Sequence, residues 1–378
     1  MECKAVLRIT CFITSHGFGH ATRSFSVLSE LAKDKKIQLN IISTLPKWFI
    51  HENLKETSYQ THHFQTDVGM VQETPFKHSL DDTKEKINQF LKFNDVELKS
   101  VTKVLDNYRS DCFFCDISPL GLYLGRKMGI PSCLLENFTW DWIYEGYEKR
   151  EKDFSRPVEK LKEIYSYANL HIQTSPVCRK KSDFYEVDPI FRTPKKGAEE
   201  IHKQIGNNFR KPVFLITTGG ISQEYSFQEK IKKEQDFFFI LTGNFKKVEK
   251  QDNLCLLPHR NKFHFPDLVN CADGIIGKVG YGTLAEAWGN QKPLMGVFRK
   301  NFRESEALLN FALKNLPLLE ISNEQFQTGE WIKKIKELRE KKSKHDKLTP
   351  QNGKEQTVKI LRNWIKNRFK LPTSKAIV

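Results

Sequence analysis

Short apolar runs alternate with longer segments of helical periodicity along most of this chain. The runs expected to form strands are Val6–Thr14, Leu39–Ser43, Cys112–Asp116, Ser132–Leu135, Leu170–Gln173, Val213–Thr217, Phe237–Thr242, Asn253–Leu257, Gly274–Ile276 and Leu294–Phe298. Between two of them, apolar residues recur at helical spacing, namely Ile87, Phe90, Leu91, Val101, Val104 and Leu105. This alternation predicts an α/β fold, in which helices cover both faces of parallel sheets.

A polar stretch divides the expected strands into two series. Residues 193–211 are rich in Lys, Glu and Asn and contain or border on Pro194 and Pro212. Because the chain of 378 residues exceeds a typical domain of ~100–200 residues, we expect two doubly wound domains with a cleft between them. The predicted division is a first domain at 1–195, a linker at 196–211, a second domain at 212–350 and a C-terminal helix and tail at 351–378. Apolar residues that mark this last helix are Val358, Leu361, Ile365 and Phe369.

The net charge of +15 indicates attraction to polyanions, among them an anionic membrane surface. The basic residues are scattered, and neither zinc-finger spacing nor an aromatic RNA-binding motif occurs, so we expect no specific nucleic-acid partner. No apolar run approaches the ~18–20 residues that span a bilayer. We therefore expect a cytoplasmic protein, with peripheral binding to the inner face of the membrane as a further hypothesis.

The eight cysteines are spread along the chain, mostly within apolar runs. Cys112 and Cys115 form a CxxC pair inside an expected strand, without the second ligand pair that a zinc site needs. A redox CxxC would open a helix instead. The pattern favours buried, reduced thiols and predicts no metal site.

A glycine-bearing turn, Ser15-His-Gly-Phe-Gly-His-Ala-Thr-Arg23, follows the first expected strand and opens a helical pattern. Such a turn lets backbone N–H groups and the helix N-terminus face an anion. His16 and His20 would lie at the carboxyl edge of the sheet, where open α/β sheets bind ligands. The competing interpretation is that Gly17 and Gly19 merely permit a tight turn.

A second glycine-rich turn, Gly277 to Glu286, follows another expected strand. Its glycine spacing matches neither a Walker A loop nor a dinucleotide fingerprint. Thr283 and Glu286 have the spacing of a capping box, but a carboxylate there is equally suited to bind two ribose hydroxyls. A weaker glycine pair, Gly219-Gly220, ends the first strand of the second half and offers backbone donors to a diphosphate.

Two segments of the first half combine carboxylates, amides and indoles: residues 67–72 and 136–142. Sugar-binding sites use this mixture because hydroxyls need both donors and acceptors, while C–H faces pack on aromatic rings. The alternative is a polar loop with partly buried tryptophans. The residues that this pattern nominates for acceptor or sugar binding are Asp67, Gln72, Glu136, Asn137 and Trp140.

Four motifs, taken together and in order, resemble a known family. They are Ser15–Arg23, Asp67-x-Gly-x-x-Gln72, Asn137–Tyr144 and Gly277-Lys-x-Gly-Tyr-Gly-Thr-x-x-Glu286. The set resembles the glycosyltransferase-like domain at the N-terminus of plant L-arabinokinases and its free-standing bacterial relatives. More distantly it resembles the N-acetylglucosaminyltransferase that makes lipid II. The resemblance covers roughly residues 6–310 and implies the GT-B fold, two Rossmann-like domains with a nucleotide sugar in the cleft between them.

By position, the resemblance implies roles for residues of both domains. Glu286 would bind the donor ribose, and His16 or His20 would face the acceptor, with Asp116 and Asp141 as nearby carboxylates. The remaining donor contacts that it implies are Gly17, Gly19, Gly219, Gly220, Phe263, Phe265, Lys278, Gly280, Gly282, Thr283, Arg303 and Glu304.

The implied activity is metal-independent, inverting transfer of a sugar from a nucleotide sugar, UDP being the expected nucleotide, to an unidentified hydroxyl acceptor. His16 is the preferred general base, while helix N-termini, glycine amides and Lys278 would stabilise the departing diphosphate. No cofactor besides the donor is implied. Two alternatives stay open: a nucleotide-sugar epimerase on the same fold, and a non-catalytic nucleotide-sugar-binding protein. The sequence has no counterpart of the arabinokinase kinase domain, so we expect no sugar kinase activity.

Overall fold

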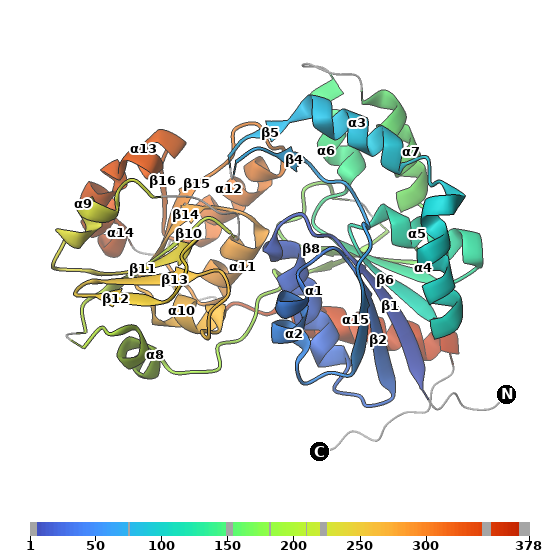
Figure 1. The fold of residues 1–378 in the computed structure, drawn as a ribbon, viewed down its shortest axis with the longest axis horizontal. Coiled ribbons are helices and arrows are strands. Elements are labelled where there is room, and N and C mark those ends of the chain that lie inside the picture. The colour runs from blue at the N-terminus through green and yellow to red at the C-terminus, as the bar shows by residue number, and fades with distance from the viewer. Residues whose placement is uncertain are drawn as a thin grey trace.

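The computed structural model describes residues 6–74, 76–148, 154–180, 183–208, 210–219, 225–341 and 349–369. These residues form two lobes that lie side by side, each built on a sheet with helices on both of its faces (Figure 1). The expected α/β fold is therefore confirmed.

The first lobe is built on a sheet of seven strands, and every pair of neighbours is parallel. In spatial order the strands are β3 (Tyr59–His62), β2 (Ile37–Ile42), β1 (Leu7–Ile13), β6 (Cys112–Asp116), β7 (Ser132–Glu136), β8 (Leu170–Thr174) and β9 (Tyr185–Val187). The helices of this lobe are α1 (Phe18–Leu31), α2 (Lys47–Leu54), α3 (Leu80–Phe90), α4 (Asp95–Tyr108), α5 (Pro119–Met128), α6 (Trp140–Glu148) and α7 (Ser155–Tyr165). A short antiparallel hairpin, β4 (Val71–Gln72) and β5 (His78–Ser79), precedes α3.

The second lobe repeats this plan with another sheet of seven strands. Their spatial order is β12 (Glu249–Gln251), β13 (Leu254–Pro258), β11 (Phe238–Gly243), β10 (Val213–Thr217), β14 (Gly274–Lys278), β15 (Leu294–Val297) and β16 (Leu318–Glu320), with β12 antiparallel to β13. The helices are α8 (Ala198–Ile205), α9 (Gln228–Lys232), α10 (Phe265–Cys271), α11 (Tyr281–Gly289), α12 (Glu304–Asn315), α13 (Asn323–Thr328), α14 (Ile335–Glu340) and the 3₁₀ helix η1 (Glu330–Lys334).

The ten strands expected from apolar runs are all present, with ends shifted by at most a few residues. The additional strands are short and lie at sheet edges or in the hairpin, where one or both faces are open to water. All three residues of β12 are exposed, for example. Except for β16, where Leu318 and Leu319 are buried, these strands carry no apolar run, so apolar periodicity could not predict them.

Within the expected linker at 196–211, the structure has a helix, α8, at residues 198–205. Ile201 and Ile205 are fully buried in the core of the second lobe, one helical turn apart, so this polar stretch is an amphipathic helix of that lobe. The predicted C-terminal helix is present as α15 (Gly353–Phe369), shown in red in Figure 1. It packs on α1 of the first lobe, and Val358, Leu361 and Ile365 join the core there.

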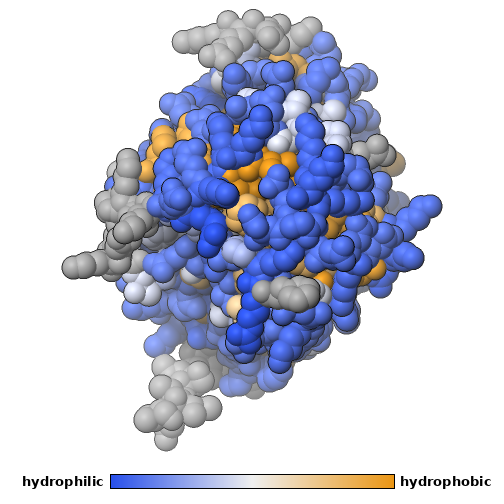
Figure 2. Space-filling model, turned by 90° about the vertical axis from the view of Figure 1, so that its left-hand side faces the viewer, coloured by the Kyte–Doolittle hydropathy of each residue, from blue (hydrophilic) through white to orange (hydrophobic). Residues whose placement is uncertain are grey.

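The cysteine prediction holds for the CxxC pair, since Cys112 and Cys115 form no disulfide and are buried in β6. No helix in the described ranges is both long enough and apolar enough to cross a membrane. Figure 2 views the second lobe from its outer side, where hydrophilic residues cover most of the face and apolar residues appear in separate patches.

Candidate functional site

The loop between β1 and α1 brings both histidines to the carboxyl edge of the first sheet. Gly17, with φ of 83°, is the N-cap of α1, and no side chain caps this helix. The first-turn amides of α1 are therefore available to a ligand. The loop lies at the point where the strand order reverses between β1 and β6, which is where open α/β sheets bind ligands.

The loop between β14 and α11 has the same construction in the second lobe. Gly280 is the N-cap of α11, again without a side-chain cap. The capping-box interpretation of Thr283 and Glu286 is wrong, because α11 begins at Tyr281 and places Glu286 in its second turn. The two loops meet: a Cβ built on Gly282 would lie 2.8 Å from Cα of Gly19. Two uncapped helix N-termini, one from each lobe, thus converge.

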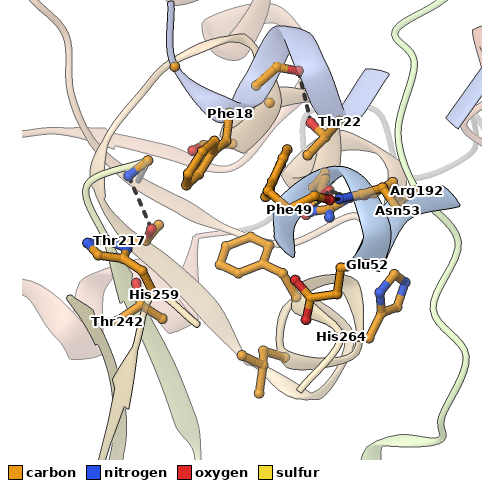
Figure 3. A pocket seen from close by; sticks show the side chains of 18 of the residues that line it. Phe18, Thr22, Phe49, Glu52, Asn53, Arg192, Thr217, Thr242, His259 and His264 are labelled. Atoms are coloured by element: carbon orange, nitrogen blue, oxygen red, sulfur yellow. Dashed lines mark hydrogen bonds and ion pairs between the residues drawn. The ribbon is translucent and has the colours of Figure 1, made fainter. Parts of the chain in front are cut away.

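A cavity of about 380 Å³ lies at this junction and is lined by both lobes. In Figure 3, Glu52 and Asn53 of α2 stand on one side of it with Arg192, and Thr217, Thr242 and His259 stand on the other. The sequence-predicted residues that line the cavity are His16, Gly17, Gly19, His20, Gln72, Gly219, Phe263, Phe265, Lys278, Gly280, Gly282, Thr283, Glu286 and Glu304. Gly220 lies outside the described residues.

Glu286 lines this cavity and has one carboxylate oxygen without a partner among the described residues. Its Oε1 accepts a hydrogen bond from Nε of Arg192 at 2.7 Å, whereas the buried Oε2 has no partner among the described residues. Burial raises the pKa of Glu286, and the Arg192 guanidinium offsets part of that effect. A buried acceptor that lacks a donor is costly, and a ligand hydroxyl would remove the cost.

The other end of the cavity holds two histidines and two cations. Nε2 of His16 is buried without a hydrogen-bond partner among the described residues. Burial, together with the charges of Arg299 and Lys278, lowers the pKa of His16 to about 3. Burial and Arg299 likewise lower the pKa of Lys278 to about 7. His16 is therefore neutral at physiological pH, as a proton acceptor must be.

Gly69, from the motif at residues 67–72, makes room for the His16 imidazole. A Cβ on Gly69 would lie 2.5 Å from Nδ1 of His16, and φ at Gly69 is 65°. The ring of His16 also packs edge-on against Trp140, with 4.9 Å between centroids. These contacts hold the imidazole in one orientation.

Asp116 does not line the cavity but lies behind His20, where it is held by other side chains. Nε and Nη2 of Arg23 donate to its two oxygens at 3.0 and 2.8 Å, and Ser24 donates as well. Nδ1 of His20 lies 3.8 Å from Oδ1 of Asp116, too far for a hydrogen bond. Asp116 is thus the buried partner of Arg23, a pairing with no sequence signal.

Asp141 and Arg303 also lie away from the cavity and pair with charged neighbours instead. Oδ2 of Asp141 is 3.2 Å from Nη2 of Arg179. Arg303 reaches across to the first lobe, where it donates to the carbonyl oxygen of Trp142 and lies 3.3 Å from Glu145. Arg303 therefore joins the lobes, and its assignment to the donor sugar is not supported.

Four of the five residues nominated for acceptor binding have structural partners instead. Asp67 accepts from Nε1 of Trp140 at 2.8 Å, and burial raises its pKa to about 6. Glu136 accepts from Gln173 at 2.8 Å inside the first lobe. Asn137 donates to Oε1 of Glu304 at 2.8 Å and so links the lobes. Gln72 lines the cavity, as expected.

Sequence reasoning missed several residues of the cavity wall. Phe49, Glu52 and Asn53 on α2 have no local motif, and neither has Arg192, near the end of the expected first domain. Arg299 is the first residue of the run Arg-Lys-Asn-Phe-Arg-Glu, whose last two residues, Arg303 and Glu304, were assigned to donor binding. Its place in this run was the one sequence signal that pointed to Arg299.

Two sheet domains that close on a cavity at the carboxyl edges of both sheets define the GT-B class of fold, and the chain has this fold. No family model matches the sequence. It is 24% identical over 330 residues to the L-arabinokinase of Arabidopsis thaliana, a match that covers 85% of this chain and 31% of that protein. The chain therefore spans about a third of the length of the curated relative that it matches.

Several solved glycosyltransferases share the fold along almost the whole chain. The calicheamicin glycosyltransferase CalG4 matches with a TM-score of 0.61 and 14% identity, covering 96% of this chain and 99% of that one. The spinosyn rhamnosyltransferase SpnG, solved with thymidine diphosphate, has a TM-score of 0.57 and 11% identity, covering 94% and 100%. UGT2 of Phytolacca americana, solved with UDP-2-fluoro-glucose and pterostilbene, has a TM-score of 0.57 and 11% identity, covering 97% and 100%.

Proposed function

We propose that this protein is a glycosyltransferase that moves a sugar from a nucleoside diphosphate sugar, UDP being the expected nucleotide, to a hydroxyl acceptor. The observation that carries the proposal is the unpartnered Oε2 of Glu286 at the wall of a cavity where two uncapped helix N-termini meet. A ribose hydroxyl suits the carboxylate, and a diphosphate suits the helix N-termini. Two of the similar structures were solved with a nucleoside diphosphate or its sugar.

The proposed reaction is a single inverting displacement. The acceptor oxygen attacks the anomeric carbon, the bond from that carbon to the diphosphate oxygen breaks, and its electron pair leaves with the diphosphate. His16, whose Nε2 is unpartnered, takes the hydroxyl proton. Lys278 and the amides of Gly280 and Gly282 stabilise the departing charge, so the proposal needs no metal ion.

The polarity of the cavity helps the base to work when the donor is present. Burial is the main cause of the low pKa of His16, and the positive charges of Arg299 and Lys278 lower it further. A bound diphosphate would balance these charges, and the pKa of His16 would then rise toward its ordinary range. The base would become stronger in the complex in which it is needed.

Incubation of the pure protein with UDP-, GDP-, CMP- and dTDP-sugars and an extract of acceptors tests the proposal. Release of a nucleoside diphosphate that requires acceptor and is lost in His16→Ala supports it. Conversion of the donor without acceptor would indicate an epimerase instead. If no donor is consumed and Glu286→Ala leaves UDP affinity unchanged, the proposal fails. Binding to an anionic membrane stays a prediction from the net charge.

A further inference from the structure

Arg299 is a buried cation that the proposed mechanism does not use as a ligand of the substrate. It lines the cavity, its side chain is 8% exposed, and its Nε has no hydrogen-bond partner in the described part of the chain. Its guanidinium lies flat against Phe302, with 3.7 Å from the guanidinium carbon to the ring centroid, so its position is fixed. A buried N–H donor without a partner points to a ligand that supplies the acceptor.

The charges around Arg299 do not balance. Arg299 and Lys278 face the same carboxylate, Glu304, whose Oε2 is 4.0 Å from Nη2 of Arg299. The other oxygen of Glu304 already accepts from Asn137. The ammonium group of Lys278 makes no hydrogen bond with any residue that the structure describes, although the backbone of Lys278 pairs with β15. When Lys278 is protonated, two cations and one carboxylate leave a positive charge in a buried place, which is costly unless an anion binds there.

The backbone places Arg299 beside the turn that opens α11. Lys278 at the end of β14 pairs with Val297 at the end of β15, and N–H of Val279 donates to the carbonyl oxygen of Val297 at 3.0 Å. Arg299 and Gly280, the N-cap of α11, each stand two residues beyond that pair. An anion held at the N-terminus of α11 would therefore lie next to the guanidinium.

We propose that Arg299 binds the diphosphate of the nucleotide sugar through its Nε, together with Lys278, and stabilises the charge that the diphosphate gains as its bond to the sugar breaks. This inference rests on the proposed function. The net positive charge of the two cations and Glu304, with two helix N-termini worth roughly half a charge each, balances the two negative charges of a diphosphate.

Calorimetric titration with UDP and with uridine tests the inference. If the wild-type protein binds another base best, the diphosphate and the nucleoside of that base are used instead. In Arg299→Gln we expect UDP to bind about 10- to 100-fold more weakly, whereas the affinity for uridine changes less than about twofold. Arg299→Lys keeps the charge but loses Nε, and we expect UDP to bind about three- to tenfold more weakly with uridine unchanged. Lys300→Gln is the matched control, because it removes the same charge from an exposed neighbour and should alter neither affinity.

Circular dichroism establishes whether the variants fold. If Arg299→Gln does not fold, the test is made with Arg299→Lys. Equal loss of UDP and uridine affinity in a folded variant would overturn the inference, because it would indicate a structural role. Unchanged UDP affinity would overturn it too, even if the variant lost affinity for a UDP-uronic acid. If wild-type protein binds no nucleoside diphosphate at all, the proposed function fails instead.

Discussion

At the scale of single residues, Glu286 allows the sharpest test of the nucleotide site. Glu286→Gln replaces an acceptor-only carboxylate by an amide of the same shape and removes the charge that Arg192 contacts. We expect UDP to bind about tenfold more weakly, because hydrogen bonds to a charged group contribute about 1.5–3 kcal/mol. The measurement is calorimetric titration with UDP.

A matched ligand separates loss of ribose contacts from general damage to the cavity. UDP that lacks both ribose hydroxyls cannot donate to Glu286, so its affinity for wild-type protein and for the glutamine variant should be the same. If the variant loses affinity for this analogue as strongly as for UDP, Glu286 supports the cavity wall rather than the ribose.

From the pKa of Lys278 we predict how nucleotide binding depends on pH. Its pKa of about 7 means that the free protein loses this charge as the pH rises through neutrality. A diphosphate prefers the protonated form, so UDP affinity should fall by as much as about tenfold per pH unit above pH 7. Titration from pH 6 to 9 measures the slope. Lys278→Met should bind UDP weakly with a much flatter profile, and an equally steep profile in that variant would contradict the assignment.

The same group affects the stability of the free protein. The pKa of Lys278 is lowered from 10.5 in the unfolded chain, so the unfolded chain binds more protons between about pH 7 and 10.5. Below pH 7 the buried ammonium therefore lowers the free energy of unfolding by its full amount. This destabilisation disappears as the pH rises toward 10.5.

At the scale of elements, the first turns of α1 and α11 form one of the contacts that hold the lobes together. Gly282→Ala would place a methyl group 2.8 Å from Cα of Gly19, and backbone on both sides would have to move. We expect kcat to fall about 10- to 100-fold, because small displacements of reacting groups have effects of this size. Steady-state release of nucleoside diphosphate is the measurement.

Gly197→Ala is the control for that glycine. Its φ is −69°, and a Cβ there would meet no atom within 4 Å, so activity should not change. Gly19→Ala touches the same contact from the other lobe, and the double variant should be no worse than either single one. Additive losses would argue against a shared contact.

The strands and the two glycine turns could be predicted from the sequence because they depend on local patterns. Apolar runs mark strands buried on both faces, and a turn between strand and helix has few solutions. The chemistry of individual carboxylates could not be predicted in this way. Asp116 is separated from Arg23 by 93 residues, and Asn137 from Glu304 by 167, so nothing near either residue in the sequence reveals its partner.

The same limit explains the missing half of the cavity wall. Phe49 and Glu52 lie on a short helix of the first lobe, and they meet the second lobe through the packing of the whole molecule. Asp67 illustrates the opposite error, since its motif predicted a sugar contact but its carboxylate accepts from Trp140 inside the first lobe. The motif is still explained, because Gly69 makes room for His16.

At the scale of the whole molecule, the chain crosses between the lobes twice, and the two crossings are bonded to each other. The first crossing follows Val187, and the second leads into α15. N–H of Gly353 donates to the carbonyl oxygen of Pro189 at 3.1 Å, and the side chain of Asn352 donates to the carbonyl oxygen of Phe191 at 2.8 Å. The side chain of Gln356 bonds to both the backbone N–H and the carboxylate of Asp188. Any change in the angle between the lobes must therefore pass through this pair of segments.

Docking of α15 on the first lobe anchors the second of these crossings, and this gives a prediction that does not depend on catalysis. Leu361→Ala removes a side chain that is 2% exposed, so the free energy of unfolding should fall by about 2–4 kcal/mol. Lys359→Ala, on the exposed face of the same helix, should change it by less than about 0.5 kcal/mol. Urea denaturation followed by circular dichroism measures both. Because α15 does not line the cavity, folded Leu361→Ala should bind UDP as the wild-type protein does. A loss of UDP affinity would mean that the anchoring of this crossing also controls closure of the lobes.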